Sequence, residues 1–140
     1  MERLPVVSCQ WRLAWAWFIG AGLTFLLLLT QTTSGKYGEQ YTKVWSWFLP
    51  TVVPTLTLVI GALVYGAKDQ PSNATVDKRM FTLSLILSII YLFLVLGTLL
   101  STPFSRATPV EWIGQSHLWL SPVQGLVSSV LGAFFVSRRN

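Results

Sequence analysis

The chain has 140 residues, of which 52% are hydrophobic and only 11% are charged. Because a soluble domain carries about twice that charged fraction, the composition argues against an ordinary soluble domain and indicates a chain embedded in lipid. The net charge is +5, but the basic residues stand at the ends of apolar segments. This is the pattern of a membrane protein, so no nucleic-acid partner is expected.

Four apolar segments are long enough for a helix to cross a bilayer, which takes roughly 20 residues. They are residues 11–30, 47–67, 80–100 and 118–136. The first ends in TQTTSG rather than in a small-residue cleavage site, so we expect it to stay in the mature chain. The sequence therefore predicts an all-α integral membrane protein, with residues 1–140 forming a single four-helix transmembrane domain.

The distribution of Lys and Arg predicts the orientation. Seven of the ten basic residues lie at the N-terminus, in the middle loop and in the C-terminal tail, and three lie in the other two loops. The first group is Arg3, Arg12, Lys68, Lys78, Arg79, Arg138 and Arg139, and the second is Lys36, Lys43 and Arg106. Because basic loops stay in the cytoplasm, we expect both termini to be cytoplasmic.

Tryptophans stand near the ends of the predicted spans. Those expected at the outer surface are Trp45, Trp47, Trp112 and Trp119, and those expected at the inner surface are Trp11, Trp15 and Trp17. We interpret all of them as anchors, because an amphipathic ring prefers the headgroup region.

The second and fourth segments resemble each other. They align without a gap when the sequence is shifted by 71 positions, which places Gly61 on Gly132. Each carries a stripe of small or weakly polar residues at the spacing of one helix face. The stripes are Pro50, Pro54, Thr57 and Gly61, and Ser121, Gly125, Ser128 and Gly132.

Helices in lipid associate through close packing of small side chains. We therefore interpret the stripes as helix-packing faces, within one chain or between subunits. The first and third segments carry comparable tracks, Ala16-Gly20-Thr24 and Ser84-Ser88-Tyr91. All four helices are expected to turn these faces toward a shared centre, as two similar helical hairpins.

Two prolines stand near the start of the second segment. Pro50 falls in the first turn, where a missing N–H breaks no helical bond. Pro54 removes the donor for the carbonyl of Pro50, so a bend is expected there. The hydroxyls of Thr51 and Thr55 are candidates to bond the freed backbone groups.

No charged residue lies in the middle of a span, which argues against an ion-coupled transporter. Gln124 is the only amide within a span and Tyr91 the only mid-span phenol. Together with Ser88 they either bond neighbouring helices or line a path for a solute, which Thr57 and Ser128 would extend. No catalytic, metal-ligand or nucleotide-binding motif is present, so we expect neither enzymatic activity nor a cofactor.

Two polar outer loops flank the predicted spans and are expected to cap the bundle or meet a partner. The segment VEWIG, residues 110–114, is expected to be ordered. On the inner side, residues 68–79 form the only loop large enough to receive a cytoplasmic protein partner.

The run GKYGEQ followed by WSWFLPTVVPTLTLVIG, within residues 35–61, resembles small four-span bacterial membrane proteins from conflict or anti-phage gene neighbourhoods. The resemblance implies an inner-membrane module beside a separate cytoplasmic sensor, and it supplies no catalytic residues. The sequence thus predicts a homo-oligomer, or a complex with another membrane subunit, that acts as a membrane-perturbing effector. A small channel or carrier for a neutral solute and a passive anchor or assembly subunit are the alternatives.

Overall fold

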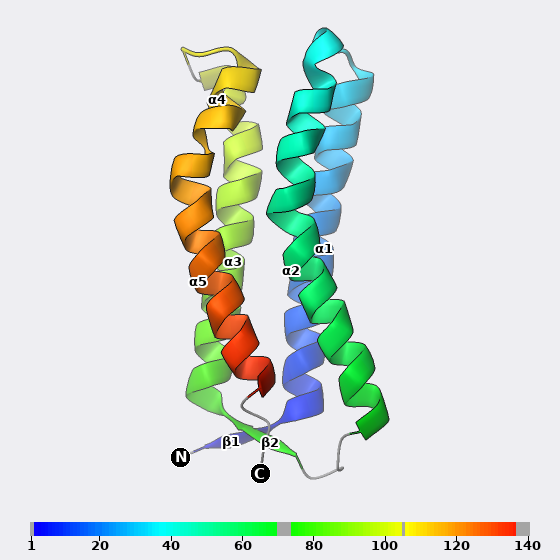
Figure 1. Cartoon of the computed structure of the whole chain (residues 1–140), viewed down its shortest axis with the longest axis vertical. Helices are drawn as coiled ribbons and strands as arrows, with labels where there is room; N and C mark the ends of the chain where they lie inside the picture. The colour runs from blue at the N-terminus through cyan, green and yellow to red at the C-terminus, as the bar shows by residue number, and fades with distance from the viewer. Residues whose placement is uncertain (1, 70–73, 105, 137–140) are drawn as a thin grey trace.

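The computed structural model describes residues 2–69, 74–104 and 106–136. Its helices are α1 (Val6–Thr33), α2 (Tyr41–Asp69), α3 (Lys78–Leu100), α4 (Pro109–Gln115) and α5 (His117–Val136) (Figure 1). Its short elements are the strands β1 (Arg3–Pro5) and β2 (Thr75–Asp77) and the 3₁₀ turns η1 (Gly38–Gln40) and η2 (Thr102–Phe104).

The four long helices α1, α2, α3 and α5 are long and apolar enough to cross a membrane. This confirms four long apolar helices at the predicted positions, although the first two begin several residues before the predicted boundaries. The short helix α4 confirms that the VEWIG segment is ordered. It begins with a capping box, in which the hydroxyl of Thr108 accepts a hydrogen bond from the backbone N–H of Glu111, and the Glu111 carboxylate accepts one from the backbone N–H of Thr108.

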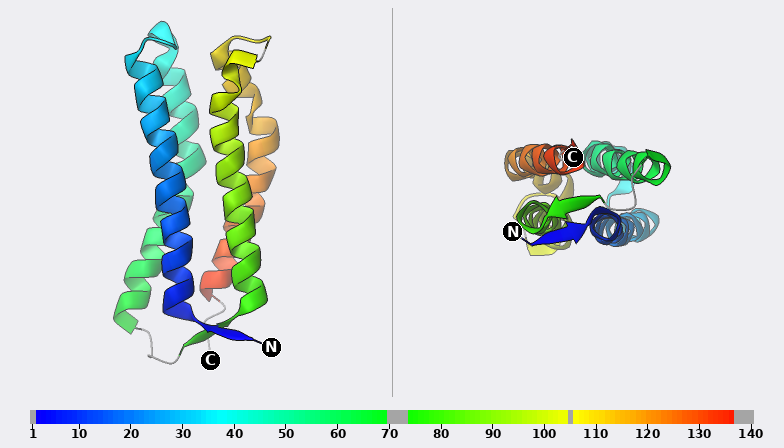
Figure 2. Two further views of the ribbon diagram at one scale, coloured as in Figure 1. Left: turned by 180° about the vertical axis from the view of Figure 1, so that it is seen from behind. Right: turned by 90° about the horizontal axis from the view of Figure 1, so that it is seen from below.

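The long helices stand at the four corners of a bundle (Figure 2). The helix α3 packs closely along both α1 and α5, and α1 packs along α2, whereas α2 and α5 touch much less. The two pairs α1–α2 and α3–α5 are therefore joined mainly through α1 and α3. As a result, α2 and α5 lie side by side on one face of the molecule with a loosely packed seam between them (Figures 1 and 2).

The small-residue tracks on α1 and α3 face each other, as the sequence predicts, although Ala16 and Gly20 are only half-buried. Thr24, Ser84 and Ser88 are buried. A Cβ atom added to Gly20 would lie 2.7 Å from Cδ1 of Leu92 on α3, so this glycine lets α1 and α3 approach closely. The hydroxyl of Thr24 donates a hydrogen bond to the carbonyl of Gly20 over 2.8 Å. This bond satisfies the hydroxyl, for which lipid tails offer no hydrogen-bond partner.

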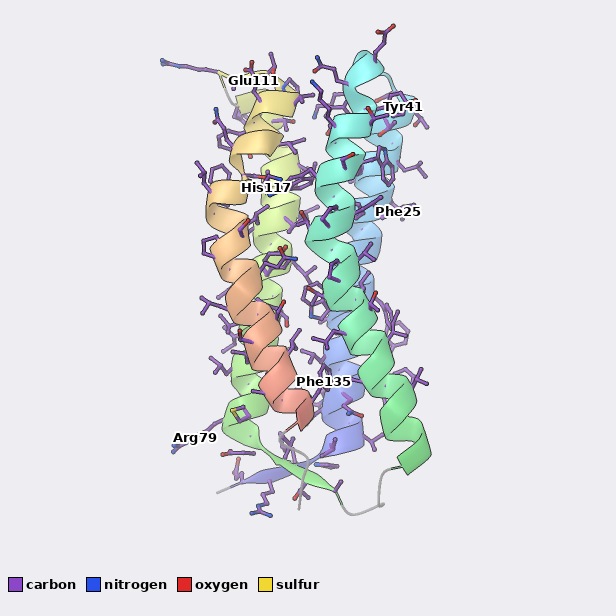
Figure 3. All side chains as sticks on the ribbon, viewed as in Figure 1. Phe25, Tyr41, Arg79, Glu111, His117 and Phe135 are labelled. Atoms are coloured by element: carbon purple, nitrogen blue, oxygen red, sulfur yellow. The ribbon has the colours of Figure 1, made fainter. Side chains whose placement is uncertain are left out.

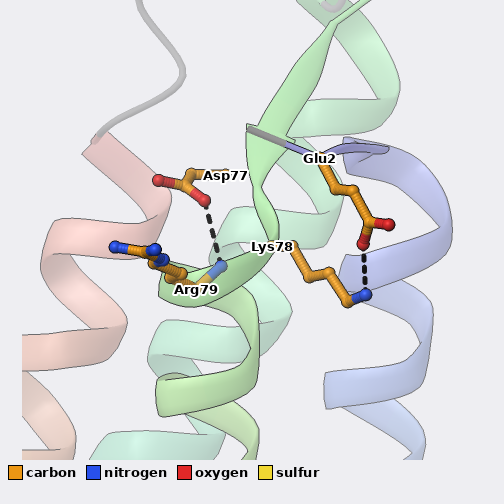
Figure 4. Close-up of polar contacts among 4 residues, drawn as sticks. All are labelled: Glu2, Asp77, Lys78 and Arg79. Atoms are coloured by element: carbon orange, nitrogen blue, oxygen red, sulfur yellow. Dashed lines mark hydrogen bonds and ion pairs between the residues drawn. The ribbon is translucent and has the colours of Figure 1, made fainter.

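A two-stranded sheet, which the sequence does not predict, joins the N-terminus to the segment before α3. Strands β1 and β2 pair antiparallel, with Leu4 opposite Val76. Lys78 forms an ion pair with Glu2, and Asp77 caps α3 by accepting a hydrogen bond from the backbone N–H of Arg79 over 3.0 Å (Figure 4). The hydrogen bond and charge of Lys78 lower the pKa of Glu2. These contacts tie the start of α1 to the start of α3.

At the opposite end, the two loops are linked to each other. Lys36 donates to the hydroxyl of Thr102 over 2.6 Å, which connects the α1–α2 loop to the turn after α3. The hydroxyl of Tyr37 bonds the side chain of Gln31. Burial lowers the pKa of Lys36 and raises the pKa of Tyr37 to about 12.

Two of the predicted tryptophan anchors are core residues instead. Trp17 is fully buried and Trp47 nearly so, because both side chains lie on the sides of their helices that face the bundle. Trp11 and Trp15 are exposed as expected of anchors. Trp112 donates to the carbonyl of Thr98 over 3.1 Å, so its indole also secures α4 to α3.

Candidate functional site

A polar junction forms where α2, α3 and α5 meet, with its Tyr91 contact buried in the bundle and its Gln124 contact at the surface. The hydroxyl of Tyr91, a fully buried residue of α3, donates to the carbonyl of Thr51 over 2.8 Å. The side-chain amide of Gln124 on α5 donates to the carbonyl of Pro50 over 3.2 Å and lies 3.4 Å from that of Thr51. Two of the three predicted path-lining residues thus converge on one turn of α2.

The junction lies at this turn because of Pro54. A helix donates each N–H to the carbonyl four residues earlier, and Pro54 has no N–H to give to the carbonyl of Pro50. Gln124 supplies the missing donor from the neighbouring helix. α2 nevertheless continues as one helix past both prolines and changes direction along its length (Figure 1). Because α2 begins at Tyr41, Pro50 lies inside the helix, so the expectation that it falls in the first turn and breaks no helical bond is wrong.

The expectation that threonine hydroxyls bond the carbonyl freed by Pro54 is wrong. Thr51 donates to the carbonyl of Trp47, and the hydroxyl of Thr55 has no hydrogen-bond partner among the described residues. A helical threonine reaches the carbonyl three or four residues before it. Pro50 lies one residue before Thr51 and five before Thr55, so neither hydroxyl is placed to reach its carbonyl.

Three further polar groups are buried next to the junction. The hydroxyls of Ser88 and Thr55 and the indole N–H of Trp17 have no hydrogen-bond partner within the described part of the chain, and all three residues are at most 2% exposed. Ser88 lies about one turn from Tyr91, and Thr55 lies about one turn from Thr51, in both cases toward the β1–β2 end. The Trp17 ring lies 6.0 Å from that of Tyr91, between centroids.

Each such buried group costs about 1–3 kcal/mol when it stays unpaired. Three helices therefore contribute unused hydrogen-bonding capacity at similar depths. Ser88, the third predicted path-lining residue, belongs to this group rather than to the hydrogen-bonded junction. The arrangement offers unpaired hydrogen-bonding groups, but it holds no charged group and no nucleophile paired with a base.

The two predicted packing stripes lie on the outside of the single chain. Pro50, Pro54, Thr57 and Gly61 on α2 are exposed, as are Ser121, Gly125 and Ser128 on α5, while Gly132 is half-buried. A Cβ atom added to Gly61, Gly125 or Gly132 would meet no atom of the described part of the chain within 4 Å. The expectation that all four helices turn small faces toward a shared centre is therefore wrong for α2 and α5.

Bulky residues occupy the core-facing sides of these two helices instead. Those on α2 are Val44, Trp47, Phe48, Val52 and Val59, and those on α5 are Leu120, Val127, Leu131 and Phe134. In lipid both the small and the bulky face of a helix are apolar, so hydrophobicity alone does not decide which one turns inward.

The two stripes lie on the same face of the molecule. Gln124 on α5 points toward α2, since its side chain donates to the carbonyl of Pro50. Successive residues are rotated by 100° around a helix. Ser121, Gly125 and Ser128 therefore lie next to Gln124 on α5, on the side turned away from the core. On α2, the other side of the helix forms a separate apolar groove with α1, a cavity of about 350 Å³ that includes Phe18, Leu49 and Val53. The stripes therefore flank the α2–α5 seam, and we call this surface the α2–α5 face.

No protein-family model, curated protein or solved structure matches this chain. In the described residues no three or more His, Cys, Asp or Glu side chains are grouped so that they could hold a metal ion.

Proposed function

We propose that this protein is a non-enzymatic membrane module whose subunits assemble through the α2–α5 face and then perturb the bilayer together with a cytoplasmic partner. The observation that carries the proposal is the exposure of two small-residue stripes side by side on this one face. Small residues let helix backbones approach closely in lipid. Among the described residues of one chain, no neighbour requires the small size of the glycines in these stripes.

We further propose that the β1–β2 end faces the cytoplasm of a bacterial inner membrane. The basic residues Arg3, Lys78 and Arg79 lie in or beside the sheet, in keeping with the retention of basic segments inside. The candidate partner surface is residues 68–79, of which 70–73 lie outside the described residues, as do Arg138 and Arg139. The described part of this segment includes β2, which is fixed by its pairing with β1.

Glycine-to-leucine variants test the assembly. Gly61→Leu and Gly125→Leu place a bulky side chain on the α2–α5 face without a clash inside the chain, because nothing lies within 4 Å of either Cβ position. We expect both variants to fold and to lose the oligomer in mild detergent. Gly22→Leu is the matched control, since Gly22 also has no neighbour within 4 Å but lines the α1–α2 groove instead. Oligomers that persist in both test variants would contradict the proposal.

Membrane potential tests the effector activity. We expect expression in a bacterial host, alone or with the neighbouring genes, to depolarise the membrane, and Gly61→Leu to weaken this effect. Growth and potential unchanged by the wild-type protein under both conditions would favour a passive anchor or assembly subunit.

A small channel or carrier for a neutral solute is the second candidate. The unpaired buried groups of Ser88, Thr55 and Trp17 support it, because they can exchange hydrogen bonds with a passing polar solute. However, Thr57 and Ser128 lie on the exposed face rather than beside Ser88, so one chain does not assemble the whole predicted path. Solute uptake without depolarisation would favour this candidate.

A further inference from the structure

A cavity of about 280 Å³ lies at the loop end of the molecule, between the start of α2 and the helices α4 and α5. Its polar lining consists of Lys43, Ser46, Trp47 and His117, and Ile113 contributes to the apolar part of its wall. Figure 3 shows His117 at the beginning of α5, between this helix and α2. Neither the proposed function nor the polar junction uses this cavity.

The side chains around this cavity are rich in hydrogen-bond donors. A lysine ammonium brings three donors and a positive charge, and an imidazole carries at least one N–H in either charge state. The indole N–H of Trp47 has no hydrogen-bond partner in the described residues, although Trp47 is only 4% exposed. The side chain of Lys43 likewise makes no hydrogen bond or ion pair to another described residue.

No acidic side chain is among the residues that line the cavity. Glu39 and Glu111, the acidic residues of this end, do not line the cavity. The carboxylate of Glu111 accepts a hydrogen bond from the backbone N–H of Thr108 instead. A cavity with one cation, several donors and no acid in its lining is complementary to an anion.

The position of the cavity along the helix bundle indicates which anion it binds. Lys43 and Trp47 belong to the first two turns of α2, and His117 begins α5. The rings of Trp112 and Trp119, 5.3 Å apart between centroids, lie at the same end. Tryptophans of membrane proteins concentrate at the headgroup level, where lipid phosphates lie. We propose that this cavity binds the phosphate group of a membrane phospholipid.

Thermal unfolding of the purified full chain in a neutral detergent tests the proposal. We expect added phosphatidylglycerol to raise the unfolding temperature and diacylglycerol, which lacks the phosphate, to leave it unchanged. Lys43→Gln combined with His117→Gln should weaken the apparent lipid affinity by about fivefold or more, since a basic residue near a membrane contributes about 1 kcal/mol and tenfold corresponds to 1.4 kcal/mol. Lys43→Arg should retain most of the effect.

Arg106→Gln is the matched control, because it removes one positive charge from the same end at an exposed position outside the cavity. An equal loss of lipid stabilisation in Arg106→Gln and in the cavity variant would overturn the proposal, and so would equal stabilisation by diacylglycerol. Inorganic phosphate distinguishes the source of the ligand. If phosphate alone stabilises the wild type as strongly as the lipid does and the cavity variant does not respond, the anion site stands and the lipid assignment fails.

Discussion

The hydrogen bond from Gln124 to the carbonyl of Pro50 replaces a helical bond that Pro54 cannot make, and a double-mutant cycle tests this directly. Gln124→Leu keeps a side chain of similar size but removes the amide donor, which leaves the freed carbonyl unpaired. Pro54→Ala restores an N–H at the position from which a helix donates to Pro50. Once this restored backbone N–H occupies the carbonyl of Pro50, the loss of the Gln124 amide should matter less.

The expected magnitude follows from the measured strength of hydrogen bonds between membrane helices, which average about 0.6 kcal/mol and reach about 1.7 kcal/mol. With an N···O distance of 3.2 Å and a second, longer contact at 3.4 Å, Gln124→Leu should cost about 1 kcal/mol of unfolding free energy in the wild-type background. In the Pro54→Ala background the cost should fall by about half or more. The coupling energy is therefore expected to be about 0.5–1 kcal/mol.

The unfolding free energy is measured in mixed detergent micelles and extrapolated to zero denaturing detergent. It is measured for the wild type, for the two single variants and for the double variant. Tyr91→Phe provides the matched control. Tyr91 donates to the carbonyl of Thr51, whose helical donor is the N–H of Thr55 rather than position 54, so Tyr91→Phe and Pro54→Ala should be additive. Additivity of Gln124→Leu with Pro54→Ala to within about 0.3 kcal/mol would refute the donor replacement. Equal coupling for Gln124 and Tyr91 would indicate a change of helix shape instead.

Three further predictions concern packing, pH and orientation. Gly20→Leu should destabilise the folded chain by about 1–3 kcal/mol, because even a Cβ atom there would lie 2.7 Å from Leu92, and an unfolding free energy equal to that of Gly22→Leu would contradict the packing of α1 on α3. Tyr37 keeps its proton in the folded state up to a pKa of about 12 but ionises near 10 when unfolded. Its contribution to stability should therefore be complete below pH 10 and lost as the pH rises to about 12. The difference in unfolding free energy between wild type and Tyr37→Phe should shrink over that range, and a constant difference would contradict the assignment. Cysteines at the exposed positions Glu39 and Gln115 should react with an impermeant reagent from outside intact cells and one at Thr75 only after permeabilisation, so labelling of Thr75 in intact cells would reverse the orientation.

Much of the fold follows from the sequence because a bilayer imposes simple length requirements. Each of the four apolar segments became a long helix, since a chain in lipid satisfies its backbone groups within helices. The Ser84–Ser88–Tyr91 track was correctly placed inside. The β1–β2 sheet was missed, because strands of three residues carry no readable periodicity and their pairing joins Leu4 to the distant Val76.

The candidate site was predicted only in part. The sequence shows that Pro54 leaves a carbonyl without a donor and that Gln124 is the only amide within a span. Joining these two facts requires knowing that α2 and α5 are neighbours at that depth, which helix periodicity does not reveal. The same missing information explains why the stripe at Gly61 was expected to face inward. The roles of Trp17 and Thr55 were missed because their burial depends on helix rotation within the bundle.

Disulfide cross-linking in native membranes tests most directly whether subunits meet through the α2–α5 face. In a Cys9→Ala background, the single-cysteine variants Thr57→Cys and Ser128→Cys place thiols on this face, and Leu23→Cys places one on the exposed side of α1 in its groove with α3. We predict covalent dimers for at least one of the first two variants and none for Leu23→Cys under mild oxidation. Monomers in both α2–α5 variants, or dimers formed equally by Leu23→Cys, would contradict assembly through this face.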